Sequence, residues 1–254
     1  MNPNPSRITH HVSRTHHAFI GTSGWNYDHW KGRFYPENLP SSKWLEYFAQ
    51  HFSTVEINFS FYRWPTREQF EKWAAETPDD FIFAVKASRY ITHRKKLKDA
   101  AEPVERTITH AKGLGRKLGP ILFQLPPHWK ANLQRLQEFL SFVPRDIRCT
   151  IEFRDPSWLA DEVFAVLEKH GVANCIMAAP DLPRVMKVTA PFSYIRMHSG
   201  GEETEGKFTE EQLEWWADQV REMLKTVDVY VYFNNDYKGF ALENAKALRT
   251  MVNG

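Results

Sequence analysis

Short apolar runs rich in β-branched and aromatic residues alternate, from residue 18 onward, with segments in which apolar residues recur at helical spacing. The runs predict eight β-strands, over residues 18–22, 54–58, 81–87, 120–125, 149–153, 173–177, 193–198 and 228–234. The periodic segments predict seven helices, over residues 43–51, 67–76, 101–117, 133–141, 161–170, 210–225 and 241–251. Strands and helices that alternate in this way form a parallel sheet with right-handed crossovers.

Eight such units in a chain of 254 residues predict one (β/α)8 TIM-type barrel over residues 18–254. The sixth unit is irregular, because Pro180, Pro183 and Pro191 interrupt any long helix after the sixth strand. We expect a short helix, an extra strand or a loop there. An open doubly wound sheet is the alternative, but the sequence contains no GxGxxG motif for a nucleotide cofactor.

The alternation of side chains along each strand separates an outer face, which packs on helices, from an inner face. In the second strand Val55 and Ile57 take the outer face, so Glu56 and Asn58 point inward. The same reasoning places polar groups inside strands two, three, four, five, seven and eight, near their carboxyl ends. They are Glu56, Asn58, Lys86, Gln124, Glu152, Arg154, Arg196, His198, Tyr232 and Asn234, with Asp236 just beyond.

Buried charges are costly unless they are paired or used. A barrel that needs only stability would fill these positions with Val, Ile and Leu, and the carboxyl rim is where barrel enzymes keep their chemistry. The inner-face residues therefore predict a functional site. An internal ion-pair network, for example Glu152 with Arg154 or Arg196, is the structural alternative.

Aromatic and basic residues follow the first three strands. Between residues 25 and 64 aromatic residues are far denser than in the whole chain, of which they form 14%. Trp25 and Tyr27 are expected at the rim, where flat rings stack on sugars or bases. The main basic cluster, residues 89–98, is expected on the same side of the barrel. A lid packed on itself and a solvated loop are the plainer interpretations of these two segments.

Composition and charge narrow the function classes. Lys and Arg number 33 and Asp and Glu number 31, whereas general nucleic-acid binders usually carry a larger basic excess. Residues 1–17 lack a hydrophobic period and are expected to form a disordered tail. There is no apolar run of roughly 18 residues, no secretory signal, and no zinc or disulfide pattern around Cys149 and Cys175. We expect a cytoplasmic protein with no membrane partner.

Seven ordered blocks of the chain resemble the YecE-like proteins that share domain of unknown function 72. The blocks are GTSGWNYDHWKGRFYP (21–36), TVEINFSFYRWP (54–65), FAVKASRYITH (83–93), GPILFQLPP (119–127), IEFRDPSW (151–158), YIRMHS (194–199) and VYVYFNND (229–236). The chain is similar to this family over nearly everything from residue 18 onward. The resemblance implies a TIM-type barrel and supplies no activity. Likeness to sugar-isomerase-like and endonuclease-IV-like barrels concerns the fold alone.

Two positions depart from the family pattern. The family usually has His after the Glu-Phe-Arg triplet, where this chain has Asp155. It usually has His-Gly after the seventh strand, where this chain has His198, Ser199 and Gly200. The first departure replaces an imidazole with a carboxylate, so a family mechanism that needs that histidine is in question here.

Two familiar chemistries fit the inner-face residues poorly. A glycosidase needs two carboxylates, which Glu56 and Glu152 supply. However, Gln124, Arg196 and His198 stand on the strands where many barrel glycosidases place their acid and nucleophile. One divalent metal held by Glu56, Glu152 and His198 is a weak option, and a three-zinc site lacks the necessary histidines.

The inner cations Lys86, Arg154 and Arg196 favour an anionic ligand such as a sugar phosphate or sugar acid. The leading hypothesis is an enzyme that performs acid/base chemistry on a small anionic or polyhydroxylated substrate at the carboxyl mouth of the barrel. The catalytic candidates are Glu56, Lys86, Glu152 and His198. The substrate-binding candidates are Trp25, Tyr27, Asn58, Gln124, Arg154, Arg196, Tyr232, Asn234 and Asp236.

Other interpretations stay open. Lys86 forms a Schiff base if its neighbours lower its pKa, although a salt-bridged lysine is the commoner arrangement. A nucleic-acid-binding or processing protein would use the aromatic rim and residues 89–98, and a non-catalytic metabolite sensor is the third alternative. The sequence does not distinguish an isomerase, a lyase or a hydrolase, and it leaves the oligomeric state open.

Overall fold

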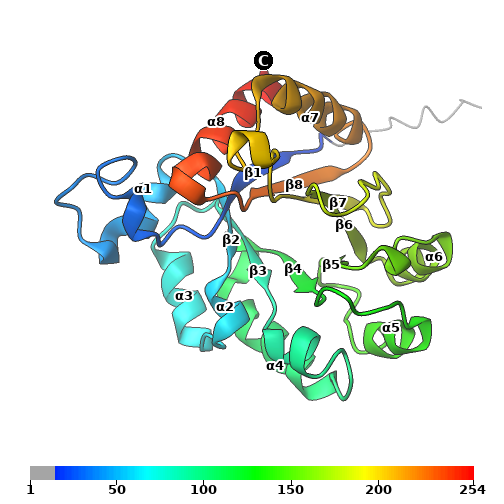
Figure 1. The fold of residues 1–254 in the computed structure, drawn as a ribbon. Coiled ribbons are helices and arrows are strands. Elements are labelled where there is room, and N and C mark those ends of the chain that lie inside the picture. The colour runs from blue at the N-terminus through cyan, green and yellow to red at the C-terminus, as the bar shows by residue number, and fades with distance from the viewer. Residues whose placement is uncertain (1–14) are drawn as a thin grey trace, which may run out of the picture.

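Eight parallel strands close into a barrel in the computed structural model, which describes residues 15–254 (Figure 1). The strands follow one another around the barrel in chain order, and the last pairs with the first. They are β1 Ala18–Ser23, β2 Thr54–Ile57, β3 Ile82–Lys86, β4 Leu118–Gln124, β5 Cys149–Glu152, β6 Ala173–Ala178, β7 Phe192–Met197 and β8 Asp228–Phe233. This topology confirms the predicted TIM-type barrel.

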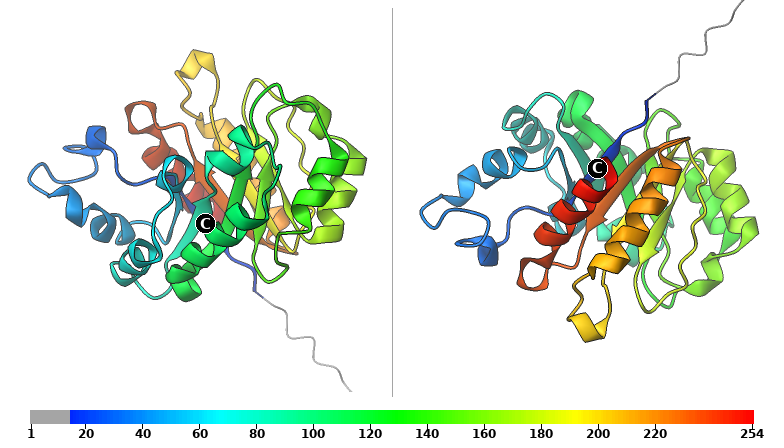
Figure 2. Two further views of the ribbon diagram at one scale, coloured as in Figure 1. Left: turned by 90° about the horizontal axis from the view of Figure 1, so that it is seen from below. Right: turned by 90° about the horizontal axis from the view of Figure 1, so that it is seen from above.

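Helices surround the barrel, as the two views of Figure 2 show from opposite sides. They are α1 Trp44–Ala49, α2 Phe59–Tyr62, α3 Arg67–Ala75, α4 Ala101–Ala111, α5 Leu133–Leu140, α6 Asp161–His170, α7 Glu210–Met223 and α8 Phe240–Asn253. Two of them, α2 and α3, follow β2. Residues 179–191 between β6 and β7 form no helix, so the predicted irregular sixth unit is a loop.

Local sequence signals set several helix ends. Thr209 and Gln212 form a complete capping box at the start of α7, with hydrogen bonds of 3.2 and 2.9 Å between each side chain and the other residue's N–H. Thr66 caps α3 by accepting from the N–H of Gln69. Gly171 ends α6 with a φ of 66°, a left-handed conformation that glycine adopts without strain.

Apolar side chains form two separate clusters, and their division locates the site. The larger cluster packs the outer face of the strands against the helices. The smaller one fills the barrel interior and includes Ala84, Leu122, Cys175 and Tyr194. Two residues further along β3 the inward side chain is Lys86, and two residues further along β7 it is Arg196. The interior therefore changes from apolar to charged toward the carboxyl ends of the strands.

The chain enters the barrel at the opposite, amino end of the strands. Of the expected tail, residues 1–14 lie outside the described residues, whereas the N–H of His17 donates to Asp228 at 3.2 Å. Across the described part of the chain, every helix is too short or too polar to cross a membrane. Cys149 and Cys175 are both buried and free.

Candidate active site

The guanidinium of Arg196, near the end of β7, joins two buried carboxylates. Its Nη2 lies 2.8 Å from Oε1 of Glu56, and its Nη1 lies 2.6 Å from Oε2 of Glu152. All three side chains are 0% exposed. The structure thus brings together inward residues of β2, β5 and β7 that are far apart in the sequence.

Both oxygens of the Glu56 carboxylate accept hydrogen bonds. The hydroxyl of Ser23 donates to Oε1 at 2.6 Å, and the hydroxyl of Tyr194 donates to Oε2 at 2.6 Å. Burial opposes ionisation, but the charges of Arg196 and Lys86 and these hydrogen bonds hold the pKa of Glu56 below its ordinary value. Glu56 is therefore an ionised anchor for Arg196. Sequence reasoning missed Ser23 and Tyr194, although the same alternation places both on the inner face.

Glu152 is similarly occupied. Its Oε1 accepts a hydrogen bond of 2.8 Å from Gln124 and is paired with Nε of Arg154, and it lies 3.3 Å from Nε2 of His198. Burial again opposes ionisation, but Arg196, His198 and Arg154 together hold the pKa of Glu152 well below its usual range. Both predicted carboxylates are thus buried ion-pair partners.

His198 lies between the buried network and solvent, with 10% of its side chain exposed. Its Nε2 is 3.0 Å from Nη2 of Arg154, and its Nδ1 is 3.2 Å from Nδ2 of Asn234. Burial lowers the pKa of His198, and the two arginines lower it further against the opposing effect of Glu152. The imidazole is therefore neutral near pH 7 and can accept a proton.

Lys86 is the cation of this cluster that has no acidic partner. Within residues 15–254, Nζ makes no ion pair within 4.0 Å and no side-chain hydrogen bond. It lies 4.1 Å from the ring centroid of Phe61, in α2. Burial lowers the pKa of Lys86 to about 8, with a further contribution from Arg196. A substantial fraction of the amine is therefore unprotonated at mildly alkaline pH.

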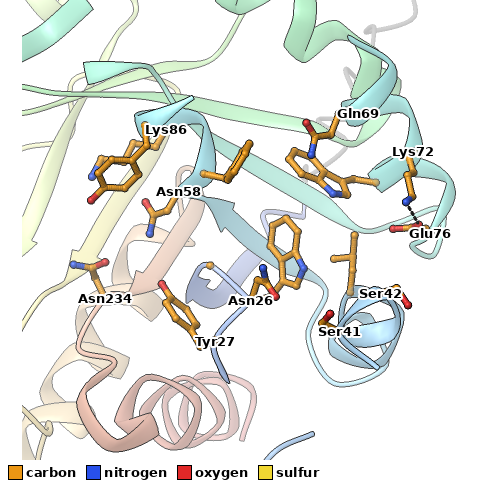
Figure 3. Close-up of a pocket in the computed structure, with 16 residues that line it drawn as sticks. Asn26, Tyr27, Ser41, Ser42, Asn58, Gln69, Lys72, Glu76, Lys86 and Asn234 are labelled. Atoms are coloured by element: carbon orange, nitrogen blue, oxygen red, sulfur yellow. Dashed lines mark ion pairs between the residues drawn. The ribbon is translucent and has the colours of Figure 1, made fainter. Parts of the chain in front are cut away.

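A cleft of about 730 Å³, here called the mouth cleft, opens beside Lys86 (Figure 3). Asn58 and Asn234 line it together with Lys86 at one end, and Lys72 and Glu76 form an ion pair of 3.7 Å at the other. This volume falls in the usual range for small-molecule sites, roughly 300–1,000 Å³. The cleft thus connects the charged interior with the surface around α3.

The aromatic residues of the loop after β1 line the same cleft. The hydroxyl of Tyr27 donates a hydrogen bond of 2.6 Å to the carbonyl of Ser23. Burial, followed by the charge of Asp236, raises the pKa of Tyr27 to about 12. Trp25 packs edge-on against Trp73, with ring centroids 5.4 Å apart. These rings form a fixed wall of the mouth cleft.

A second hollow of about 390 Å³ lies on the other side of Asn234. His198 lines it, and so do the acidic residues Glu202, Glu205 and Asp236. Because Asn234 borders both spaces, the lysine and the histidine are accessible from adjoining hollows.

Two predicted substrate-binding residues are engaged elsewhere. Tyr232 is fully buried, and its hydroxyl lies 2.7 Å from Oγ1 of Thr54, inside the barrel and away from both hollows. Asp236 accepts a hydrogen bond of 2.8 Å from Trp30 and lies 2.9 Å from Nε2 of His29. Burial raises the pKa of Asp236 despite these contacts. Its carboxylate fixes the loop after β1.

The weak metal candidates do not form a ligand set. In the described residues, no group of three or more His, Cys, Asp or Glu side chains is placed to hold a metal ion. The physical reason is that Arg196 stands between Glu56 and Glu152 and takes an oxygen of each. A guanidinium supplies the positive charge at the point where the two carboxylates converge.

The two departures from the family pattern have local roles. Asp155 accepts hydrogen bonds from the N–H and the hydroxyl of Ser157, at 3.0 and 2.7 Å, and lies 3.4 Å from Lys130. It caps the turn after β5 and does not join Glu152. After β7, a Cβ on Gly200 would lie 2.1 Å from a backbone oxygen of the following loop, so only glycine fits there.

Comparisons with known proteins agree with the barrel. A family model described as "Protein of unknown function DUF72" matches residues 19–254. The chain is 27% identical to the UPF0759 protein YunF of Bacillus subtilis, over 92% of this chain and 94% of YunF. It is 30% identical to the UPF0759 protein YecE of Escherichia coli, over 61% of this chain and 56% of YecE.

Solved structures are similar over almost the whole chain. A DUF72 family protein of Thermotoga maritima matches with a TM-score of 0.82 and 31% identity, over 94% of this chain and 100% of that one. A DUF72 family protein of Enterococcus faecalis has the same fold at 20% identity, with a TM-score of 0.80 over 93% of this chain and 96% of that one. The family model matches residues 19–254, and the solved structures share the fold over 94% and 93% of the chain. This chain therefore belongs to the DUF72 protein family.

Proposed function

We propose that this protein is an enzyme that performs acid/base chemistry on a small anionic, hydroxyl-bearing substrate at the carboxyl mouth of the barrel. The proposal depends on one observation. Lys86 and His198 line two adjoining hollows, and the partly exposed Arg154 contacts His198, beside a buried network in which Arg196 joins two carboxylates.

The charge balance supports an anionic ligand. Among residues 15–254, the carboxylates next to Lys86, Arg154 and Arg196 are Glu56 and Glu152, so the cluster carries an excess positive charge when the lysine is protonated. Arg154 is 22% exposed, and its Nη1 makes no hydrogen bond with residues 15–254. That edge of the guanidinium is available for a phosphate or carboxylate.

Neutral polar groups support a hydroxyl-bearing ligand. Asn58 and Asn234 both line the mouth cleft beside Lys86. The Oδ1 atom of Asn58 is buried and has no hydrogen-bond partner in the described residues. A buried acceptor without a donor is costly, and a ligand hydroxyl would satisfy it.

The acid/base groups are Lys86 and His198, whose pKa values the site lowers. Lys86, with a pKa of about 8, and His198, with a lowered pKa, can each exchange a proton under physiological conditions. Glu56 and Glu152 stay ionised and have no exposed atoms, so they serve as positioning residues for Arg196.

Thermal stabilisation tests the binding part of this proposal. Sugar phosphates and sugar acids are added to the protein in parallel with the matching neutral sugars, at low and high salt. A ligand at 100 times its Kd stabilises the folded state by about 2.7 kcal/mol. We expect the anionic ligands alone to raise Tm, and we expect Arg154→Met to abolish the shift while Arg116→Met, at the amino end of β4, preserves it. Equal shifts with neutral sugars, or none across the panel, would argue against the proposal.

Turnover tests the catalytic part. Any ligand that raises Tm is incubated with the protein and followed by NMR. We expect conversion by the wild type and loss of conversion in Lys86→Met and His198→Gln. Tight binding without conversion would identify a metabolite sensor instead.

A second candidate function is binding of single-stranded nucleic acid. Phe59 and Tyr62 of α2 are 45% and 70% exposed, which leaves two rings free for base stacking. In the loop after β3, Arg89, Arg94 and Lys96 are also exposed. Fluorescence anisotropy with a single-stranded oligonucleotide distinguishes this function, since its affinity would fall steeply with salt and decrease in Tyr62→Ala.

A further inference from the structure

We infer that the amine of Lys86 is a nucleophile that forms an imine with an aldehyde or ketone carbon of the substrate. The inference rests on the proposed function and deepens it, because it assigns the substrate a carbonyl group in addition to its anionic group. It follows from how the barrel distributes its charges.

Both buried carboxylates form ion pairs with arginines, and neither forms an ion pair with Lys86. Arg196 pairs with Glu56 and Glu152, and Arg154 pairs with Glu152 as well. Lys86 projects into the same polar layer, yet within residues 15–254 it has no ion pair within 4.0 Å. A lysine that served only to balance buried charge would contact a carboxylate.

The surroundings of the amine favour its neutral form. The ring of Phe61 lies on one side at 4.1 Å, and only 8% of the residue is exposed. Burial and the positive charge of Arg196 both lower the pKa of Lys86, and together they outweigh the opposing carboxylates. The charged or titratable groups that face it are Glu56 on β2, Glu152 on β5, Arg154 just after β5, Arg196 on β7 and His93 in the loop after β3.

The mouth cleft gives the carbonyl group of a substrate access to this amine. Lys86 lines the cleft beside Asn58 and Asn234, whose amides can hydrogen-bond a carbonyl or hydroxyl oxygen (Figure 3). Asn234 in turn contacts His198 at 3.2 Å. The neutral imidazole of His198 therefore lies next to Asn234, the residue that would bind this oxygen.

The chemistry balances without a further reactant. The lone pair of Nζ forms a bond to the carbonyl carbon and the π electrons move to the oxygen. One proton then passes from Nζ to this oxygen to give a neutral carbinolamine. The oxygen then takes a second proton from solvent and leaves as water while the nitrogen lone pair forms the C=N bond, and the remaining N–H proton is released to the neutral imidazole of His198 or to solvent. One amine and one carbonyl give one imine and one water, and no atom changes its oxidation level.

Reductive trapping tests the inference on the wild-type protein. Glycolaldehyde phosphate, dihydroxyacetone phosphate and unphosphorylated glycolaldehyde are each added with sodium borohydride, which converts an imine to a stable secondary amine. Intact mass and peptide mapping then locate the adduct. We expect a single adduct, on Lys86, that forms at lower concentration with the phosphorylated compounds. Lys169→Met removes an exposed lysine of α6, outside the mouth cleft, and should leave trapping unchanged, whereas Lys86→Met should abolish it.

Competitive acetylation with trace acetic anhydride measures the reactivity of the amine without any substrate. At pH 7.5 we expect Lys86 to react at least about tenfold faster than Lys72, because burial lowers the pKa of Lys86 to about 8 and leaves part of its amine unprotonated. Equal or slower acetylation of Lys86, or borohydride adducts spread over exposed lysines, would overturn the inference. If anionic ligands raise Tm but no adduct forms on Lys86, the imine is excluded and the proposed function stands. If neither occurs, both fail.

Discussion

Arg196 and Glu152 form a fully buried ion pair, with 2.6 Å between Nη1 and Oε2. The same guanidinium holds Glu56 at 2.8 Å, so one cation contacts two carboxylates that have no contact with solvent. Removal of one partner from such a group leaves uncompensated charge in the interior. The network should therefore dominate the electrostatic contribution to stability.

Arg196→Met should destabilise the fold by about 3–5 kcal/mol, the usual cost of breaking a buried pair. Urea unfolding measures the loss. Arg221→Met is the control, since Arg221 pairs with Asp218 on the surface and should contribute under about 1 kcal/mol. Addition of Glu56→Gln and Glu152→Gln to Arg196→Met should recover part of the loss. A cost for Arg196→Met no larger than that of the control would contradict the prediction.

The stability contributed by Glu152 should vanish at low pH. Its folded pKa lies well below the ordinary 4.5, so its ionised form stabilises the fold above pH 4.5. That contribution is lost as the pH falls through the folded value. The difference in unfolding free energy between wild type and Glu152→Gln should be largest near neutral pH and should narrow below pH 4.5. Glu214→Gln, at an exposed position, should show little difference at any pH.

The imidazole of His198 should titrate below pH 6.5, because burial and two arginines disfavour its charged form. Arg154→Met removes one of these cations and frees Glu152 to interact with the ring. The pKa of His198 should therefore rise in this variant. An NMR titration of the histidine ring protons measures the change, with Arg116→Met as the control. An unchanged or lower pKa in Arg154→Met would show that Arg154 does not control the ring.

Lys86→Met should stabilise the protein at pH 7. The folded state holds a buried amine whose pKa is lowered from 10.5 to about 8, so the protonated lysine is unfavourable there. The shift corresponds to an upper limit of roughly 3 kcal/mol. Wild type should regain stability relative to Lys86→Met as the pH rises from 8 toward 10.5, because the unfolded chain then binds more protons. Chemical unfolding across this range tests the sign, with Lys72→Met for comparison. A Lys86→Met protein less stable than wild type at pH 7 would refute it.

A residue that costs stability at its position is typical of a functional site. Lys86→Met would then give a folded protein in which loss of trapping or turnover reports on chemistry. The stability measurement and the trapping measurement are thus complementary.

The barrel and its inner charges were predictable because both depend on short-range periodicity. Val55 and Ile57 on one face of β2 are enough to direct Glu56 inward, and the same rule applies to Arg196 on β7. Seven helices were predicted from their apolar spacing. Helix α2 was missed, because its four residues are too short to show a period. It carries Phe61, which covers Lys86, so the sequence did not reveal the surroundings of the amine.

The pairing inside the site depends on long-range contacts that no local pattern encodes. Arg196 and Glu56 are 140 positions apart, and the contact between Trp30 and Asp236 spans 206. The alternation of side chains along β8 indicates that Asp236 lies near the inner face of the barrel. It does not show that the indole N–H of Trp30 donates a hydrogen bond to the Asp236 carboxylate. For the same reason the sequence could not tell that both glutamates are occupied and that the lysine is unpaired.

The mouth cleft runs from the strand-borne Lys86 to the helix-borne Lys72 and Glu76. A substrate held at its reactive end by the barrel would present its other end to the surface loops of the first two β/α units. Bond making would then depend on rigid strands, while choice among substrates would depend on segments that tolerate insertion and replacement. Replacement of these surface loops would then change substrate specificity without any change in the residues that carry out the reaction.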